Sequence, residues 1–463
     1  MSYQYNDQTI YRSLENAEYP YYFPADQMID DVTPWRQSMR YILLGWLLCA
    51  AAVETNVLAY YFPVIGGVLL YLGFRTLKKE NRWLKAGLPL SLALGIWSLI
   101  RFALSRTIWF TAISDTLPYT IADHTSQSVT LAILICLHQG IRQVQKKAGA
   151  DPDTRYILAS GGLYVVIFIL PRLGAADIFL LLSLVAVAAL AFCLYKAYKH
   201  IGQAGYAIQS APVKIRKLFV WLIAAGLVLV CVVGGILFFQ QYPMQWQPEQ
   251  PVSVENLTVR NKLAKLGMPE QILADLSEED VQALSGAQRI WVAKNFSREN
   301  NPKMSSVAIQ TEDGCMAILH FQWLNAPFYR GTECLNLEYS TIYKDYSGRV
   351  LWDDGDTVQS SPYYLLERVD RVTYSPYDSS VDSVWSSVYA AFSFPWGAEN
   401  CRGYVLYDCG KHAPGNNNFP YYYQEMPILL MNVQDVVTYF TTGRLKGGSS
   451  YFAIRNSGTQ FVD

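Results

Sequence analysis

The distribution of apolar residues divides the chain into two regions that meet near Gln241. Before this point, long apolar runs alternate with short segments rich in Lys and Arg. After it, no run is long and apolar enough to cross a bilayer as a helix, which takes about 20 residues. The pattern predicts an α-helical polytopic membrane domain followed by an extracytoplasmic α+β domain with mainly antiparallel strands.

About seven spans are expected in the first region. The apolar segments are Arg40–Val53, Val57–Phe74, Ala86–Leu104, Val129–Val144, Tyr156–Leu170, Ala175–Tyr195 and Leu218–Phe239. The first, fourth and fifth are short, so the bilayer would have to thin around them. Residues 41–74 could also form one long tilted helix. The polar triplet Glu54-Thr55-Asn56 favours a hairpin of two helices, because a carboxylate at mid-membrane is costly.

The basic residues occur in every second loop, and this sets the predicted orientation. Clusters follow the second, fourth and sixth segments, whereas the intervening loops carry few Lys and Arg. Because these residues favour the cytoplasmic side, an odd number of spans puts the N-terminus in the cytoplasm. The chain is therefore expected to be a multi-pass protein of the cell membrane whose C-terminal domain is extracellular.

Four parts are predicted along the chain. These are a polar cytoplasmic arm (1–39), a transmembrane helical domain (40–240), a linker with a short helical collar (241–304) and an extracytoplasmic mainly β domain (305–463). The first apolar segment is expected to serve as an uncleaved anchor, because the arm before it is polar.

Turn and cap residues define the elements after the membrane domain. Gly267 is a helix stop, Pro269 opens the next helix, and Ser277 with Asp280 resembles a capping box. Short β-rich runs then alternate with turn signals, among them Glu312-Asp313-Gly314 and Tyr346-Ser347-Gly348. This spacing is typical of an antiparallel sandwich or a related sheet.

Composition agrees with this division and limits the possible partners. Apolar residues make up 51% and charged residues 16% of the 463-residue chain, and the net charge is −1. Residues 241–463 contain 17 basic and 25 acidic residues, and residues 1–240 contain 20 and 13. An acidic outer half argues against nucleic acid as a partner, because phosphate binding needs a basic surface. The lipid bilayer is the expected partner of the first half.

Four of the eight cysteines lie in the outer half and could form disulfides. Cys401 with Cys409 is the preferred pair, because both flank a predicted strand, and Cys315 with Cys334 would follow. Free thiols are an open alternative. Neither pair has the CxxC spacing of a zinc site, so no metal is expected.

An aromatic surface is the main candidate for ligand binding. Tyr421, Tyr422 and Tyr423 follow the loop-forming run Gly415-Asn416-Asn417-Asn418, and Trp396 adds to the aromatic density of the outer half. Tyr and Trp combine apolar area with a polar group and are common at binding surfaces. A protein or glycan outside the cell is the expected kind of ligand.

Evidence for catalysis is weaker. Asp353-Asp354-Gly355-Asp356 could hold calcium, but it lacks EF-hand spacing and a polar hairpin turn explains it. Hydrolase carboxylates could be drawn from Glu367, Asp370, Asp378 and Asp382, yet nothing in their spacing selects a pair. His320 and His412 have no neighbouring nucleophile in a known pattern. No catalytic residues and no cofactor are therefore predicted.

The segment from Leu266 to Asp280 resembles a segment seen just outside the membrane in uncharacterised proteins of Gram-positive bacteria. The resemblance implies an extracytoplasmic position and no activity. The leading functional hypothesis is a surface protein that senses or binds a ligand. The alternatives are a transporter-associated or permease-like subunit, and a membrane-anchored hydrolase of cell-wall or glycan substrates.

Overall fold

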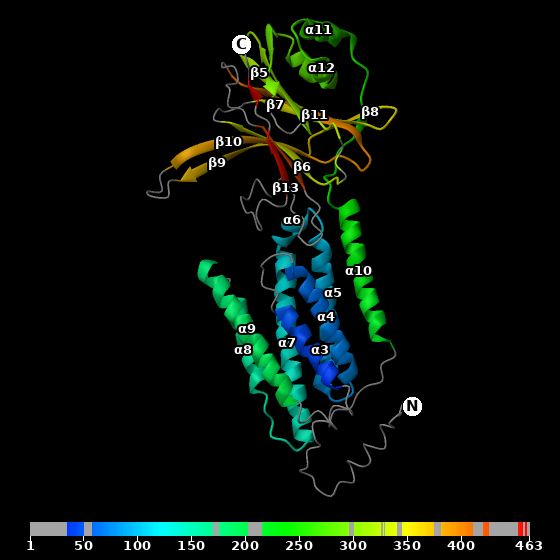
Figure 1. Cartoon of the computed structure of the whole chain (residues 1–463), viewed down its shortest axis with the longest axis vertical. Coiled ribbons are helices and arrows are strands. Elements are labelled where there is room, and N and C mark those ends of the chain that lie inside the picture. Colours follow the sequence, from blue (N-terminus) through cyan, green and yellow to red (C-terminus); the bar gives the residue numbers. More distant parts are fainter. Residues whose placement is uncertain are drawn as a thin grey trace. The chain divides into compact units, whose positions relative to one another are not determined.

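The computed structural model describes residues 35–50, 58–169, 176–201, 215–295, 301–325, 327, 329–339, 345–374, 381–410, 420–425, 452–456 and 459–460. These residues form a helical unit and a β-rich unit, and the boundary between the two units falls at Gly234/Gly235 inside α10. Figure 1 shows the helices and strands of each unit.

The helical unit consists mainly of helices that coincide with the predicted apolar segments. In the described residues these are α3 (Trp35–Ala50), α4 (Leu58–Leu77), α5 (Arg82–Leu104), α6 (Phe110–Ser114), α7 (Leu117–Lys147), α8 (Arg155–Ile169), α9 (Ala176–Ile201) and α10 (Lys217–Phe238). α3 and α4 lie side by side, so residues 41–74 are not one continuous helix.

Membrane crossing is supported for fewer helices than the seven expected. Within the described residues, three helices are long and apolar enough: α4 over Ala59–Leu77, α5 and α10. α3 and α8 contain only 16 and 15 residues, short of the usual length of about 20. α7 is long enough, but its first turns are polar. The helical unit is thus compatible with membrane association, and seven spans are not supported.

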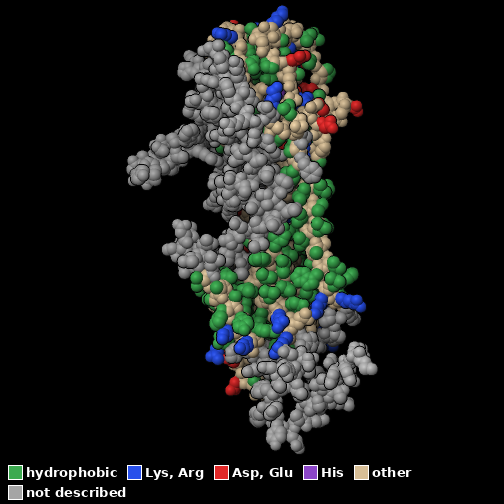
Figure 2. Space-filling view, viewed as in Figure 1, with side chains coloured by type: hydrophobic (Ala, Val, Ile, Leu, Met, Phe, Trp, Pro, Cys, Tyr) green, Lys and Arg blue, Asp and Glu red, His purple; other side chains and the backbone are tan. Residues whose placement is uncertain are grey.

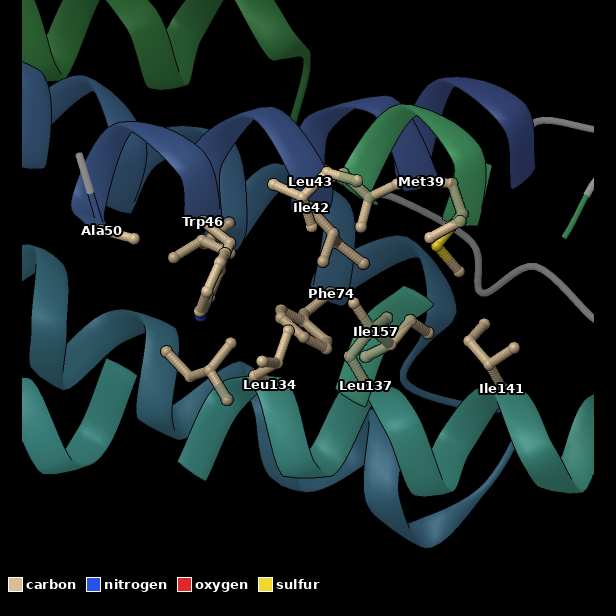
Figure 3. Close-up of a cluster of buried hydrophobic side chains, with 14 of the residues drawn as sticks. Met39, Ile42, Leu43, Trp46, Ala50, Phe74, Leu134, Leu137, Ile141 and Ile157 are labelled. Atoms are coloured by element: carbon tan, nitrogen blue, oxygen red, sulfur yellow. The ribbon is translucent and has the colours of Figure 1, made fainter. Parts of the chain in front are cut away.

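A buried apolar cluster holds the helical unit together. Met39, Ile42 and Trp46 of α3 point toward Leu137 and other apolar side chains of α7, and Figure 3 shows this contact. The Trp46 indole donates a hydrogen bond of 2.8 Å to the Thr130 carbonyl, which satisfies its buried N–H.

Close backbone approach between α4 and α5 depends on two glycines. A Cβ added at Gly67 would lie 2.7 Å from the Gly95 Cα, a distance that real Cβ atoms do not tolerate. Small residues at such crossings let two helices gain dispersion contacts that larger side chains would prevent. Gly162 of α8 is different, since an added Cβ there would meet nothing within 4 Å.

The β-rich unit contains two larger antiparallel sheets. Their strands are β1 (Gln247–Pro248), β2 (Arg289–Val292), β4 (Lys303–Gln310), β5 (Cys315–Gln322), β6 (Glu333–Tyr339), β7 (Tyr346–Asp353), β8 (Val358–Pro362), β9 (Leu365–Tyr374), β10 (Val381–Phe392), β11 (Glu399–Asp408), β12 (Pro420–Glu425) and β13 (Phe452–Asn456). The seven-stranded sheet has the order β1-β8-β7-β11-β5-β4-β2, and the five-stranded sheet has the order β13-β12-β6-β10-β9. β3 (Lys294–Asn295) pairs with β14 (Thr459–Gln460).

Each face of the seven-stranded sheet is covered by a different layer. Along β5, Ala317, Leu319 and Phe321 share a core with residues of the five-stranded sheet. The alternate residue Ile318 packs against the helices α11 (Val254–Lys265), α12 (Glu270–Asp275) and α13 (Glu278–Ala283). The period of two along a strand therefore assigns each side chain to one of two cores.

Several local predictions can now be judged. The hairpin at Glu312-Asp313-Gly314 is confirmed, since β4 pairs with β5 on either side of it. The turn expected at Tyr346-Ser347-Gly348 is wrong, because these residues begin β7. Gly348 has a φ of +154°, which L residues rarely adopt, and a Cβ there would lie 2.2 Å from the Tyr404 carbonyl oxygen. Its glycine permits the close approach of β11 and is not a turn residue.

The residues that follow α10 were expected to be a linker, but they are fastened to the β-rich unit. The Gln241 side-chain amide donates to the carbonyls of Arg330 and Phe394 at 3.1 and 3.0 Å. The ring of Tyr242 stacks on that of Tyr364 with a centroid distance of 4.3 Å.

We predict that Gly67→Ala destabilises the helical unit by about 1–3 kcal/mol, the usual cost of overpacking a tight contact. Gly162→Ala is the matched control and should be neutral or stabilising by up to about 1 kcal/mol, because Ala favours helix over Gly. Thermal unfolding of the purified protein in detergent measures both effects. Equal melting temperatures for the two variants would contradict the role assigned to the Gly67–Gly95 crossing.

Candidate functional site

Buried charged and polar groups gather between the helices α11–α13 and the seven-stranded sheet. The alternation along β5 and β11 explains this, because His320, Arg402 and Tyr404 occupy the same face as Ile318 and thus point to the helices. All three side chains are buried. The helices supply carboxylates to meet them, since buried charges are retained only when they are paired.

Asp275, at the end of α12, is the centre of this network. Its Oδ2 lies 2.8 Å from His320 Nε2, and its Oδ1 accepts a hydrogen bond of 2.8 Å from Arg402 Nε. Arg402 also donates from Nη1 to Asp353 Oδ1 at 2.8 Å. Burial raises the pKa of Asp275, but the His320 hydrogen bond and the Arg402 charge outweigh it, so the pKa is lowered overall.

The guanidinium of Arg349 binds the same helix end from another side. It donates from Nε and Nη2 to the Asp275 carbonyl at 3.0 and 2.9 Å. It also forms an ion pair with Glu249 at 2.7 Å. A cation is favourable here, because the last carbonyls of a helix lack partners in the helix itself.

Asp280 of α13 forms a second polar contact with the sheet. The predicted cap is confirmed, since Ser277 Oγ accepts a hydrogen bond of 3.0 Å from the Asp280 N–H. The Asp280 carboxylate in turn accepts hydrogen bonds from the hydroxyls of Tyr404 and Ser347. Burial and the nearby Asp280 charge raise the pKa of Tyr404 well above its usual value, so the phenol stays protonated as a donor.

Glu278 ties the helices to one another. Its carboxylate accepts hydrogen bonds from Ser253 Oγ at 2.6 Å, Asn256 Nδ2 at 2.8 Å and Arg260 Nη2 at 2.9 Å. Partial burial opposes ionisation, but these hydrogen bonds prevail and lower the pKa of Glu278 to about 2. Glu278 thus joins α13 to α11 within the helical layer.

The chemistry of the Asp275 network is structural. A His–Asp pair can activate a nucleophile in hydrolases. In the described part of the chain, however, His320 hydrogen-bonds Asp275 and contacts no serine, threonine or cysteine hydroxyl or thiol through a hydrogen bond. The network fastens α12 to β5 and β11.

A polar cleft of about 310 Å³ opens beside the β4–β5 hairpin, and it is the better candidate for a functional site. Its lining residues are Trp291, Gln310, Thr311, Glu312, Asp313, Gly314 and Cys315. The Trp291 Nε1 atom is buried and has no hydrogen-bond partner within the described residues. An unsatisfied indole N–H, two carboxylates, an amide and a thiol can all bind a polar ligand.

Cys315 brings a second cysteine to this cleft. Cys409 lies opposite it on the neighbouring strand, and the Cys409 N–H donates to the Cys315 carbonyl at 2.8 Å. A hydrogen bond from the Cys409 thiol lowers the pKa of Cys315, and the same contact together with burial raises the pKa of Cys409. Cys315 is therefore the more acidic of the two thiols.

The disulfides expected from the sequence are not formed, and all four outer cysteines are free. Cys401 and Cys409 stand at opposite ends of β11, roughly 25 Å apart at about 3.3 Å per residue, beyond the reach of a disulfide. Cys334 lies on β6 of the five-stranded sheet, whereas Cys315 begins β5 of the other sheet. Closeness in sequence was misleading for Cys401 and Cys409, because a strand between two cysteines keeps them apart.

The predicted aromatic surface is only partly visible. Tyr421, Tyr422 and Tyr423 lie on β12, which pairs with β6 and β13, and their side chains lie outside the described residues. Trp396 is 38% exposed, and its ring centroid lies 6.2 Å from that of Tyr329.

The acidic run between β7 and β8 is a hairpin turn. Asp354 Oδ1 accepts hydrogen bonds from the N–H groups of Asp356 and Thr357 at 3.2 and 2.8 Å. Asp353 is occupied by Arg402, as described above. Within the described residues, no group of three or more His, Cys, Asp or Glu side chains could hold a metal ion.

The hydrolase carboxylates lie mostly beyond what the structure describes. Glu367 is exposed on β9, and the side chains of Asp370, Asp378 and Asp382 are outside the described residues, as is His412.

Comparisons of the chain with protein-family models and with curated proteins gave no match.

We predict that Asp275→Asn destabilises the β-rich unit by about 3 kcal/mol, the low end of the cost of breaking a buried ion pair, because Arg402 keeps Asp353 as a second partner. Glu279→Gln is the control, since it removes an exposed carboxylate two residues into the next helix. Chemical unfolding of the full-length protein in detergent, followed by tryptophan fluorescence, measures the difference. A loss below 1 kcal/mol would refute the central role of Asp275.

The same network predicts sensitivity to acid. Because the pKa of Asp275 is lowered from its usual value of 3.8, its stabilising effect is fully present above that pH. It is lost as the pH falls through the lower pKa of the folded state. The stability difference between the wild type and Asp275→Asn should therefore narrow below about pH 4, as unfolding measured from pH 7 to pH 2 would show. A difference that stays constant over this range would contradict the assignment.

We also expect Cys315 and Cys409 to be the pair that oxidises. With diamide as oxidant, the two thiols lose two protons and two electrons to form one disulfide, and diamide becomes the hydrazine. Mass spectrometry of proteolytic peptides should find the Cys315–Cys409 bond and not Cys401–Cys409. Cys315→Ser should leave Cys409 as a free thiol, whereas Cys334→Ser should leave the bond unchanged.

Proposed function

We propose that this chain is a membrane-anchored binding protein whose β-rich domain lies outside the cytoplasm and captures a polar, amine-bearing ligand. The observation that carries the proposal is the cleft beside the β4–β5 hairpin. Its lining contains the carboxylates of Glu312 and Asp313 and no cationic side chain. Such a site favours a ligand that brings positive charge and hydrogen-bond donors.

Trp291 gives this cleft an anchoring surface. Its ring is covered on one side by the Arg289 guanidinium, 4.8 Å from the ring centroid. An aromatic ring of this kind combines apolar contact area with a polar group, which suits a polar ligand. A cell-surface peptide or an amino sugar carries an amine next to hydroxyl or carbonyl oxygens. The amine would meet the carboxylates of the cleft, and the oxygens would meet its hydrogen-bond donors.

The helices support membrane anchoring with the basic end in the cytoplasm. α10 is apolar along its length and almost wholly exposed, for example at Leu218, Leu229 and Val230, so water is an unfavourable surrounding for it. The α4–α5 turn and the end of α7 meet at one end of the unit, where Lys147 pairs with Glu80 at 3.1 Å. Lys and Arg side chains gather at that end in Figure 2, and such clusters favour the cytoplasmic face.

The topology follows from these two features if α10 crosses the bilayer. Arg216 and Lys217 begin this helix, so its start would remain in the cytoplasm and its end would lead into the extracellular β-rich domain. The helices α3, α4, α5, α7, α8, α9 and α10 could then all belong to the membrane domain, with the short helices α3 and α8 shielded by their neighbours. Terminal tags probed with an impermeant reagent on intact cells would test this: the C-terminal tag should react and the N-terminal tag should not.

Binding is tested with amine probes on the purified full-length protein. Glucosamine and spermidine should raise the melting temperature, whereas N-acetylglucosamine, which lacks the charge, should have a smaller effect. The double variant Glu312→Gln/Asp313→Asn should lose at least tenfold in affinity for the amines, about 1.4 kcal/mol. Glu367→Gln, an exposed carboxylate on β9, is the control and should bind normally. Equal binding by the double variant would overturn the proposed site.

A further inference from the structure

A second cleft, in the helical unit, is lined by four basic side chains. It has a volume of about 770 Å³ and lies at the turn between α4 and α5, two of the helices able to cross a bilayer. The lining residues are Lys78, Lys79, Arg82 and Lys85, together with the apolar residues Ala86, Leu88 and Pro89. The lining therefore combines four positive charges with an apolar surface.

The described part of the chain contributes no ion pair to the basic side chains of this cleft. Glu80 is the acidic residue of the turn, but its carboxylate is almost fully buried and pairs with Lys147 of α7 at 3.1 Å. The Arg82 guanidinium lies 5.3 Å from the centroid of the Trp83 ring, a contact that leaves its charge available.

Side chains, and not the helix terminus, provide the attraction for an anion. The first free N–H groups of α5 are taken by Asn81, whose Oδ1 accepts from Trp83 and Leu84 at 3.1 and 3.0 Å. Asn81 Nδ2 donates to the Gly140 carbonyl of α7 at 3.1 Å, which holds the turn in place. The four basic residues thus extend from a fixed frame.

An exposed apolar stripe continues from the cleft along α5. Leu92, Ile96 and Ile100 follow one another at intervals of four residues, and they are 44%, 59% and 45% exposed. Residues four apart share one face of a helix. The stripe begins next to Leu88 and Pro89 of the cleft wall, so a molecule with an anionic head and an apolar chain can contact both surfaces at once.

We propose that this cleft is a binding site for the phosphate headgroup of an anionic phospholipid whose acyl chain lies along Leu92, Ile96 and Ile100. The inference requires α4 and α5 to be in the membrane, and it is independent of the amine-binding cleft. A basic cleft at the cytoplasmic ends of spanning helices is a suitable site for acidic headgroups. A free phosphate would contact only the basic side chains and would leave the apolar lining residues Ala86, Leu88 and Pro89 exposed to water.

The test compares lipids by native mass spectrometry of the full-length protein in detergent. Phosphatidylglycerol should bind at least tenfold more tightly than phosphatidylcholine. The variant Lys78→Gln/Lys79→Gln/Arg82→Gln/Lys85→Gln should lose this preference. The variant Lys196→Gln/Lys199→Gln/Arg216→Gln/Lys217→Gln removes the same charge elsewhere in the helical unit and should retain it. Loss in both variants would show general surface attraction and overturn a specific site.

Two further measurements separate the possible sources of the phosphate and guard against misfolding. Inorganic phosphate and glycerol 3-phosphate, at millimolar concentration, should not displace phosphatidylglycerol; displacement by either would overturn the role of the acyl chain. If the first variant does not fold, the salt dependence of the wild type decides. Lipid preference should fall between 50 and 500 mM salt, because contacts with an anionic headgroup are screened, and a preference independent of salt would overturn the proposal.

Discussion

The ionic contact between Asp275 and Arg402 is the constraint on which the β-rich unit depends. It joins a helix end to a central strand of the seven-stranded sheet at 2.8 Å, and it lies in a place where water cannot compensate for a lost partner. His320 and Arg349 add further bonds to the same residue. Because a buried charge is tolerable only when its partners are fixed, these residues require the helices and strands to fold as one body.

The Asp275 network and the polar cleft occupy different parts of the same strand. β5 carries His320 near its middle and Cys315 at its beginning, so one strand contributes to the buried network and to the polar cleft. The network holds the strand in register. The hairpin before it carries Glu312 and Asp313, which line the cleft and do not belong to the buried network. The proposed binding site at this hairpin therefore lies on a frame that is fixed by ion pairs.

The sequence was a good guide to local structure and a poor guide to proximity. Gly267, Ser277 and Glu312-Asp313-Gly314 have chemistry that acts over a few residues, and their caps and turns are formed. The disulfide pairs failed because strand order decides which cysteines meet, and no short-range pattern reveals that β11 lies beside β5. His320 within the apolar run of β5 was a usable signal for the buried network, since a polar residue there needs a partner. Its partner Asp275 lies 45 residues away.

The link after α10 has a mechanical consequence. The helix ends at Phe238, and Gln240 already contacts the Tyr329 hydroxyl, so only Phe239 separates the helix from the first anchored side chain. A tether of one residue has no slack. The last turn of α10 is therefore held close to the strands that bind the residues after it.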